Sequence, residues 1–528
     1  MDFDEDSIAQ EIFIGLVGPI GTDIPTVFGK LEDSLQEFGY HTHQVRLSEL
    51  LDGSKPGERE NTPYVADDRT GESREKLMSA GDDFCKKVRK ASAVAMLGIS
   101  SVRAYRLDRA YRLNREDPNI SRIAHVFWSL KRPKEVELLR KVYGNAFLLV
   151  GVHQTEADRK SLLASQLARG ESGTAKESHK SKAEKLIARD NCGRLRSSAG
   201  EAGWDFGQDV GKTFPLCDFF VDGGAPGNDI RRIIRGVFGY PFHSPTKDER
   251  GMFAAASAAL QSTDLSRQVG AAIVGKSEDI LCSGSNEVPR PHEGPYWEGA
   301  KTDLRDFTVG HDPNEVLKNE GIRDLIEVMC DAGWLESKYS KMQPAERKKA
   351  VDDADLLRGN PLGNPLEYGR VVHAEMNALM AAARLGLATQ GATLYCTTFP
   401  CHLCARHIIG GGIHDVVYIE PYPKSRVTQL YPEMTMVDGV GPTDCSRKSV
   451  GFKPFVGVAP GAFEKFFSMT KGSRKEKGGF ADPGKWDSRS FRARRVPRWK
   501  QPRAAVAEFE LRVTAWLKDN GPVEISCE

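Results

Sequence analysis

The pattern of apolar positions divides the first half of the chain into alternating strands and helices. Residues 11–17 (EIFIGLV) form an apolar, β-branched run that predicts a buried strand, and a glycine-rich turn and a helical pattern follow it directly. The same alternation recurs as far as residue 222, which predicts a parallel α/β sheet. We expect strands at residues 11–17, 43–47, 123–129, 146–152 and 218–222, and helices at residues 26–38, 73–90 and after 132–133.

A second pattern begins near residue 252, where an alanine-rich helix precedes two strands and then alternating helices and strands. This order predicts a three-layer α/β/α domain. Within it we expect helices at residues 252–260, 373–385 and 404–410, and strands at residues 268–274, 280–285, 393–397 and 415–420. Residues 286–373 form a long insertion to which the pattern assigns no fold, and the polar residues 170–199 suggest a mobile flap or an exposed helix.

Prolines and a charged run at residues 247–250 mark the predicted boundary between the two patterns. We therefore predict a first domain over residues 1–240 and a second over residues 245–470. Residues 471–528 follow as a basic, proline-containing linker that ends in an amphipathic helix at 504–518.

Composition narrows the class of protein. The 528 residues carry 74 Lys and Arg against 73 Asp and Glu, and 40% are hydrophobic. The charge balance argues against a whole surface built for nucleic acid, and the hydrophobic content excludes disorder as the dominant state. No apolar run reaches the roughly 18 residues of a membrane helix, and the acidic N-terminus is unlike a secretory signal. With ten cysteines in the chain, we expect a protein of the reducing cytoplasm with no membrane partner.

The strongest chemical signal is His373-Ala-Glu375 followed by Pro400-Cys401-His-Leu-Cys404. One imidazole and two thiolates are three zinc ligands, and a fourth position is left for water, as a catalytic zinc site requires. The chain has no second Cys-x-x-Cys, so a closed four-cysteine structural site is not available. His373, Cys401 and Cys404 are therefore predicted to bind Zn²⁺.

Glu375 lies two residues from a ligand, close enough to stand beside the metal without binding it. A carboxyl group in that place suits a proton carrier, which takes a proton from water and delivers it to the substrate. On the predicted helix that follows, Met376, Leu379, Met380 and Ala383 form an apolar stripe that we expect to pack the helix and to fix the imidazole.

Residues 252–425 resemble the deoxycytidylate deaminase branch of the cytidine deaminase superfamily. The matching stretches are 262–271, 284–289, 373–377, 395–405 and 412–418. The resemblance implies zinc-dependent hydrolysis at C4 of cytosine, with Asn286 holding the sugar. Because a nucleotide phosphate needs cations, Arg267 and Lys424 are candidates for binding it. Some relatives carry a second zinc, for which His292, His311 and Cys330 are the candidates.

A degenerate phosphate loop lies in the first domain. The loop runs through Gly18, Gly21 and Thr22, whose backbone N–H groups could cradle a phosphate, but the lysine of a working loop is absent and Asp23 stands where a cation is wanted. A second near-match at residues 207–213 has one spacer residue too few. Residues 130–135 and 150–159 resemble the late strand-and-helix part of a deoxynucleotide kinase. Three interpretations stay open for this domain: kinase, nucleotide sensor, or scaffold.

The layout of a phosphate-loop, kinase-like domain ahead of such a deaminase resembles the bacterial antiviral deoxycytidine nucleotide deaminases. The resemblance implies conversion of dCTP and dCMP to dUTP and dUMP, which depletes the nucleotide pool during phage infection. Such an enzyme needs restraint, so we expect a regulatory nucleotide at the first domain or an inhibitory small RNA at the basic residues 489–503. We also expect a homo-oligomer.

Two alternatives belong to other classes: a deaminase that edits nucleic acid, and a non-enzymatic sensor in which the deaminase fold only binds, against which Glu375 argues because a pure binding site needs no proton carrier. The mixed basic and aromatic residues 489–500 suit a deaminase that edits RNA or single-stranded DNA, although a solvated linker has the same composition. A housekeeping deaminase that turns dCMP into dUMP for dTMP supply fits the same zinc motif. Ammonia release from free nucleotides and from oligonucleotides separates the editing enzyme from the others.

Overall fold

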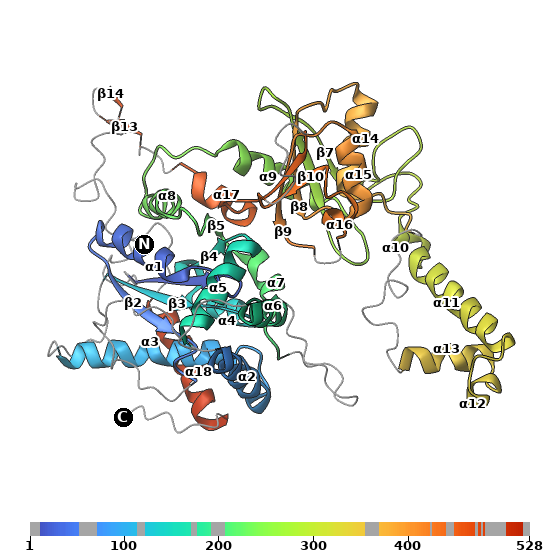
Figure 1. The fold of residues 1–528 in the computed structure, drawn as a ribbon. Helices are drawn as coiled ribbons and strands as arrows, with labels where there is room; N and C mark the ends of the chain where they lie inside the picture. Colours follow the sequence, from blue (N-terminus) through green and yellow to red (C-terminus); the bar gives the residue numbers. More distant parts are fainter. Residues whose placement is uncertain are drawn as a thin grey trace. The chain divides into compact units, whose positions relative to one another are not determined.

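The computed structural model describes residues 11–51, 71–112, 122–170, 177–191, 206–353, 369–422, 425–439, 448–469, 474–476, 479–480 and 503–520. They fall into two compact units (Figure 1). Unit 1 contains the described residues up to Arg250 together with those from Pro454 onward. Unit 2 is Gly251–Lys453.

Unit 1 is built on a six-stranded sheet of order β12-β5-β4-β1-β3-β2. The five strands from the first part of the chain pair in parallel, as the alternating pattern predicts, and β12 pairs antiparallel with β5. The strands are β1 (Ile12–Val17), β2 (His41–Arg46), β3 (Ile123–Trp128), β4 (Phe147–His153), β5 (Phe219–Asp222) and β12 (Gly457–Val458). Because parallel strands are covered on both faces, β1 and β3 are buried at every position, which is why they read as continuous apolar runs.

Two layers of helices cover this sheet. On one face Ile12, Ile14 and Leu16 pack against apolar side chains of α1 and α8. On the other face the Phe13 ring stacks on Tyr143 of α4 at a centroid distance of 3.7 Å. The helices of unit 1 are α1 (Ile24–Gln36), α2 (Gly71–Val88), α3 (Ala93–Arg112), α4 (Pro133–Tyr143), α5 (Glu156–Gly170), α6 (Glu177–Asn191), α7 (Val210–Thr213), α8 (Gly227–Val237), α17 (Pro460–Phe467) and α18 (Arg503–Asn520).

Two segments of unit 1 differ from the sequence prediction. For the polar residues 170–199 the pattern left open a mobile flap or an exposed helix; residues 177–191 form helix α6, which also buries Ala183, Leu186 and Ile187 in a cluster with α5. Its lysines and glutamates hide this apolar face in the sequence. In addition, β12 and α17 belong to unit 1, whereas the pattern placed residues up to 470 in the second domain.

Unit 2 contains a six-stranded mixed sheet of order β10-β11-β9-β8-β6-β7. Strand β6 pairs antiparallel with β7 and β8, and β8 pairs in parallel with β9. The strands are β6 (Gly270–Val274), β7 (Ile280–Ser285), β8 (Thr393–Thr398), β9 (Asp415–Glu420), β10 (Thr435–Val437) and β11 (Val450–Pro454). The charged run at residues 247–250 forms the first turn of helix α9 (Lys247–Ala259), and the division between the two units falls within this helix, after Arg250.

The helices of unit 2 include the insertion, which the sequence left without a fold. They are α10 (Asp306–Val309), α11 (Pro313–Asp331), α12 (Ser337–Ser340), α13 (Pro344–Asp353), α14 (Ala374–Leu385), α15 (His402–Gly410) and α16 (Val427–Leu430). Helix α11 buries none of its described residues, which explains why its sequence lacks a clear apolar periodicity. No helix of the described residues combines the length and apolarity needed to cross a membrane.

Helix α14 packs on a face that agrees with the predicted stripe only in part, at Leu379, which packs against the buried core. The expected stripe included Met380 and Ala383, but both are exposed, while Ala374, Ala378 and Ala382 are buried. Small side chains let the helix lie almost in backbone contact with the sheet. A Cβ on Gly284 of β7 would come within 2.4 Å of the Ala378 backbone nitrogen, so glycine is required there. Contacts among small residues, rather than the methionines, thus position the start of the helix.

Candidate active site

The three predicted metal ligands meet in unit 2. The Nδ1 atom of His373 lies 3.3 Å from Cys401 Sγ and 3.4 Å from Cys404 Sγ. Ligand atoms at about 2.1 Å (N) and 2.3 Å (S) from a tetrahedral zinc ion lie about 3.6 Å apart, so the observed spacing fits that ion. These residues are also the single group of metal-binding side chains found among the described residues.

Two helix N-termini place the ligands. His373 is the N-cap of α14, Cys401 is the N-cap of α15, and Cys404 follows in the first turn of α15. The partial positive charge at a helix N-terminus favours a thiolate. The Cys404 thiol donates a hydrogen bond that, with the neighbouring His373 imidazole, lowers the pKa of the Cys401 thiol despite its burial. The site is therefore preorganised for a divalent cation.

Asn377 holds the His373 segment in place, and sequence reasoning gave it no role. Its Nδ2 donates to the Ser285 carbonyl at 2.6 Å and to the Val372 carbonyl at 3.4 Å. Its backbone N–H donates to the His373 carbonyl at 2.8 Å. The residue lies one helical turn after His373, and that spacing is the signal that could have identified it.

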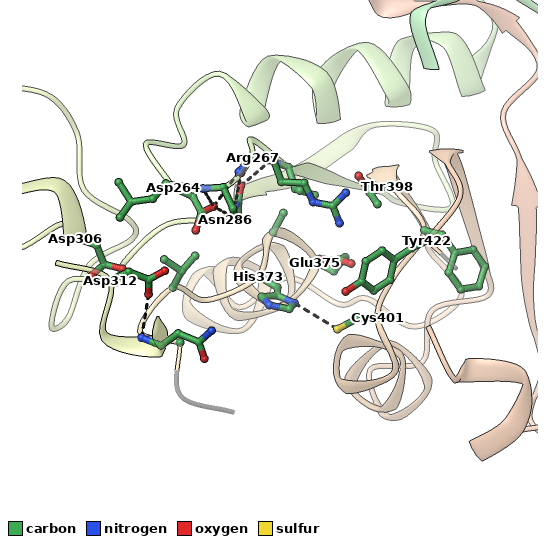
Figure 2. A pocket seen from close by; sticks show the side chains of 18 residues that line it. Asp264, Arg267, Asn286, Asp306, Asp312, His373, Glu375, Thr398, Cys401 and Tyr422 are labelled. Atoms are coloured by element: carbon green, nitrogen blue, oxygen red, sulfur yellow. Dashed lines mark hydrogen bonds between the residues drawn. The ribbon is translucent and has the colours of Figure 1, made fainter. Parts of the chain in front are cut away.

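Glu375 lies at the metal site without being one of its ligands (Figure 2). Its side chain is buried, and this burial raises the pKa of the carboxyl above the ordinary value. A carboxyl group with a raised pKa holds a proton more readily than an ordinary carboxyl and can pass it on, which is the property required of a general acid and base. The burial and the raised pKa of Glu375 are compatible with the proton-carrier role predicted for it.

A cavity of about 240 Å³ opens over His373, Glu375 and Cys401. On one wall Arg267 lies 3.2 Å from Glu420 and over the Tyr422 ring, 5.2 Å from its centroid. The Arg267 side chain is 41% exposed, so its guanidinium can reach a ligand in the cavity.

Asn286 also lines the cavity, but its amide already has two backbone partners. Its Oδ1 accepts from the Val269 N–H at 2.6 Å, and its Nδ2 donates to the Arg267 carbonyl at 2.9 Å. One hydrogen and one lone pair remain for a sugar hydroxyl. The two bonds show a second task, which is to hold the segment that carries Arg267.

The opposite wall comes from the insertion and was not predicted (Figure 2). Asp306, Asp312 and Asn314 line it, and Asp306 pairs with Arg370 at 3.2 Å. Asp312 caps α11 by accepting from the N–H groups of Asn314 and Glu315. An N-cap aspartate in a polar insertion looks like an ordinary helix start, so the sequence offers no sign that it faces a catalytic pocket.

Several predicted residues lie elsewhere. Lys424 and the basic residues 489–500 are outside the described residues. His292, His311 and Cys330 belong to no metal-binding group among the described residues, so nothing there supports a second zinc. The loop with Gly18, Gly21 and Thr22 is in unit 1, between β1 and α1.

The near-match at residues 207–213 is not a phosphate loop. Asp209 caps the short helix α7, accepting from the Lys212 N–H, and Asp209 also pairs with the Lys212 ammonium at 2.9 Å. The Lys212 side chain is therefore paired with a carboxylate of its own short helix.

Comparisons with known proteins point to the same region. Residues 245–420 match the family model of the cytidine and deoxycytidylate deaminase zinc-binding region. Over 55 residues the chain is 47% identical to the deoxycytidylate deaminase of Enterobacteria phage T2, and over 53 residues it is 45% identical to ComE operon protein 2 of Bacillus subtilis. These stretches are 10% of this chain in each case, and span 29% and 28% of the two relatives.

A solved structure, the dCMP deaminase of cyanophage S-TIM5, is 20% identical with a TM-score of 0.20, covering 40% of this chain and 99% of its own. That likeness is too weak to support a conclusion. The match to the zinc-binding region, together with the His373, Cys401 and Cys404 group, makes zinc the cofactor of this site.

Proposed function

We propose that unit 2 is a zinc-dependent hydrolase that removes the exocyclic amino group of cytosine from free deoxycytidine nucleotides. Water adds at C4, the C4–N bond breaks, and dCMP or dCTP becomes dUMP or dUTP with release of ammonia. The observation that carries this proposal is the buried Glu375 carboxyl beside three zinc-binding side chains at an open cavity. A site that only bound its ligand would have no use for a buried proton carrier.

Zinc, when bound, lowers the pKa of water toward neutrality. His373, Cys401 and Cys404 would hold it, and the remaining work falls to Glu375. Because burial raises its pKa, Glu375 can accept a proton from the attacking water and deliver it to ring N3. The same carboxyl then takes the proton of the hydroxyl group now on C4 and delivers it to the amine, so that the C4=O bond forms as the C4–N bond breaks and ammonia leaves as a neutral molecule.

The cavity wall supports a nucleotide as substrate. Arg267 provides a cation for the phosphate, and Asn286 has one hydrogen and one lone pair left for the sugar. Lys424 is proposed as a further phosphate contact. The similarity to a phage deoxycytidylate deaminase supports dCMP, and dCTP is proposed on the earlier whole-chain resemblance.

For the cellular role we propose depletion of deoxycytidine nucleotides during phage infection, with the enzyme restrained until then. The earlier resemblance of the whole layout supports this role. A housekeeping dCMP deaminase uses the same chemistry, so the two roles are distinguished by measuring nucleotide levels in cells. A defence enzyme lowers dCTP only after infection, whereas a housekeeping enzyme lowers dCMP in uninfected cells.

Replacing Glu375 tests the proposed chemistry in the full chain. Glu375→Gln should lower ammonia release from dCMP and dCTP by roughly 10³-fold, while metal analysis still finds one zinc per chain. Glu278→Gln is the control, because Glu278 is an exposed turn residue of the same unit. If Glu375→Gln kept more than a tenth of wild-type turnover, the carboxyl would not be the proton carrier. Turnover of cytosine in oligonucleotides but not in free nucleotides would favour the editing alternative.

A further inference from the structure

The degenerate loop of unit 1 lies where α/β sheets bind ligands. Strand β1 is central in the sheet and has β3 and β4 as its parallel neighbours. The segments that follow these strands therefore meet at one edge of the sheet, at the carboxyl ends of the strands. Residues 18–23 follow β1, residues 129–132 follow β3, and residues 154–155 follow β4.

A carboxylate from a distant helix fills this position. Asp190, in the last turn of α6, is 1% exposed. Its Oδ2 accepts from the Ile20 N–H at 2.6 Å and from the Lys131 ammonium at 3.0 Å, and its Oδ1 lies 2.9 Å from the same ammonium. Lys131 also donates to the Gly18 carbonyl at 3.0 Å. Lys131, which follows β3, thus supplies the cation that the loop itself lacks.

Other protein groups engage the rest of the loop. The Asp23 N–H donates to Gln154 Oε1 at 2.9 Å, and the Thr22 hydroxyl donates to the Pro19 carbonyl at 2.7 Å. Gly21 has φ +87°, and a Cβ there would lie 2.6 Å from the Arg159 carbonyl oxygen, so the turn requires glycine. The N–H groups of Ile20 and Asp23 and the hydroxyl of Thr22 therefore all face the protein's own acceptors.

A carboxylate and a phosphate make the same kinds of contact in such a place. Both present negative oxygens to backbone N–H groups and to an ammonium. We propose that Asp190 is an internal anion occupying the phosphate position of this loop. Unit 1 is then closed to phosphate in this conformation, and loss of the Asp190 charge uncovers a site in which Lys131 and the Ile20 N–H bind a phosphate group.

Helix α6 is the element that controls access to the site. Ala183, Leu186 and Ile187 pack with Leu163 and neighbouring side chains of α5, and Ile20 of the loop packs against the same cluster. Apolar contacts and the ion pair therefore fasten the end of α6 to the loop together. A displacement of this helix end would withdraw the carboxylate and leave Lys131 free to accept a ligand anion.

Phosphate binding by the full chain tests the proposal. Asp190→Asn keeps an oxygen that can accept from the Ile20 N–H but removes the charge, and Asp190→Ala empties the position. Calorimetric titration with inorganic phosphate should show at least tenfold tighter binding to both variants than to wild type. Each variant should melt at a lower temperature than wild type, since Lys131 loses its counter-ion, and phosphate should restore much of that loss. Titration with 5′-AMP then shows whether a nucleotide or the free ion is preferred.

Two further variants make the result specific. Asp218→Asn removes a carboxylate that also accepts from one backbone N–H, of Leu149, and from one cation, Arg140, but away from the loop. The Asp218→Asn variant should gain no phosphate affinity. Its unit 2 cavity is the same as in wild type, so any phosphate binding there is common to both proteins. Adding Lys131→Met to Asp190→Asn should abolish the gain.

The proposal is overturned if Asp190→Asn and Asp190→Ala bind phosphate no better than wild type. It is equally overturned if the gain survives the loss of Lys131, or if neither variant folds even in phosphate. None of these outcomes depends on the deaminase reaction, so this inference stands or falls separately from the proposed function.

Discussion

The candidate metal site of unit 2 and the degenerate phosphate loop of unit 1 are both indicated by short sequence motifs. The first is open to a cavity, whereas the second is occupied by other groups of the protein. His373, Cys401 and Cys404 face a cavity of about 240 Å³. In unit 1 the loop donors face Asp190 and Lys131, and the carboxylate is almost completely buried. The difference teaches that a motif reports the groups that can bind, whereas the rest of the fold decides whether a ligand or the protein itself satisfies them.

The largest effect is expected from breaking a second group of buried charges in unit 1 that are paired with one another. Arg106 pairs with Glu11 at 2.8 Å and with Glu510 of α18 at 2.5 Å, and all three side chains are buried. Arg106→Met leaves two buried carboxylates without their cation, which should lower the free energy of unfolding by about 3–5 kcal/mol. Chemical denaturation of the full chain measures it.

Arg112→Met is the matched control, because Arg112 belongs to the same helix but forms an exposed pair with Asp108. Exposed pairs contribute about 1 kcal/mol or less. Equal losses for the two variants would show that the buried cluster has no special role in stability.

A smaller effect is expected at Arg267, whose side chain lines the cavity of unit 2. Arg267→Ala removes a charge-assisted contact of roughly 1.5–3 kcal/mol, so KM for dCMP should rise about tenfold to a hundredfold. KM for deoxycytidine, which lacks the phosphate, should change less, and Lys424→Ala should behave in the same way. Steady-state kinetics on both substrates measure the split, with Lys453→Ala as an exposed control. Equal shifts on nucleotide and nucleoside would remove either residue from the phosphate contact.

The smallest expected effect is a pH dependence of the melting temperature of unit 1. Burial lowers the pKa of His43, His125 and His243 in unit 1, to about 4 for His243. A histidine whose folded pKa lies below its unfolded value of about 6.5 binds fewer protons when folded. Its stabilising contribution is present above pH 6.5 and is lost as the pH falls toward the folded pKa. Unit 1 should therefore melt at a lower temperature at pH 5 than at pH 7.

Differential scanning calorimetry across that range measures the shift. His243→Gln should flatten the pH dependence, and His414→Gln, which alters an exposed residue of unit 2, should not. A melting temperature that did not change between pH 7 and pH 5 would contradict the role assigned to these histidines.

Local patterns carried most of what could be predicted. Strands β1 and β3 read as apolar runs because both of their faces are covered, and the candidate metal ligands are recognisable because each supplies its own donor atom within a short motif. The contacts that decide the loop join residues 170 positions apart, Ile20 and Asp190, and no local spacing reveals them. The alanines on the buried face of α14 were not predicted, because alanine is only weakly apolar. Met380 is strongly apolar but lies on the exposed side of the helix.

The return of the chain at β12 has a consequence for synthesis on the ribosome. Strand β5 ends at Asp222 and its antiparallel partner begins at Gly457, so about 235 residues must be translated between them. At roughly 5–20 residues per second, the edge of the first sheet waits some 10–50 s for its last strand. The sheet of unit 2 is complete once Pro454 has emerged, before that strand is available. A message broken shortly after that codon would thus yield a polypeptide with its candidate metal ligands in place and its first sheet unfinished.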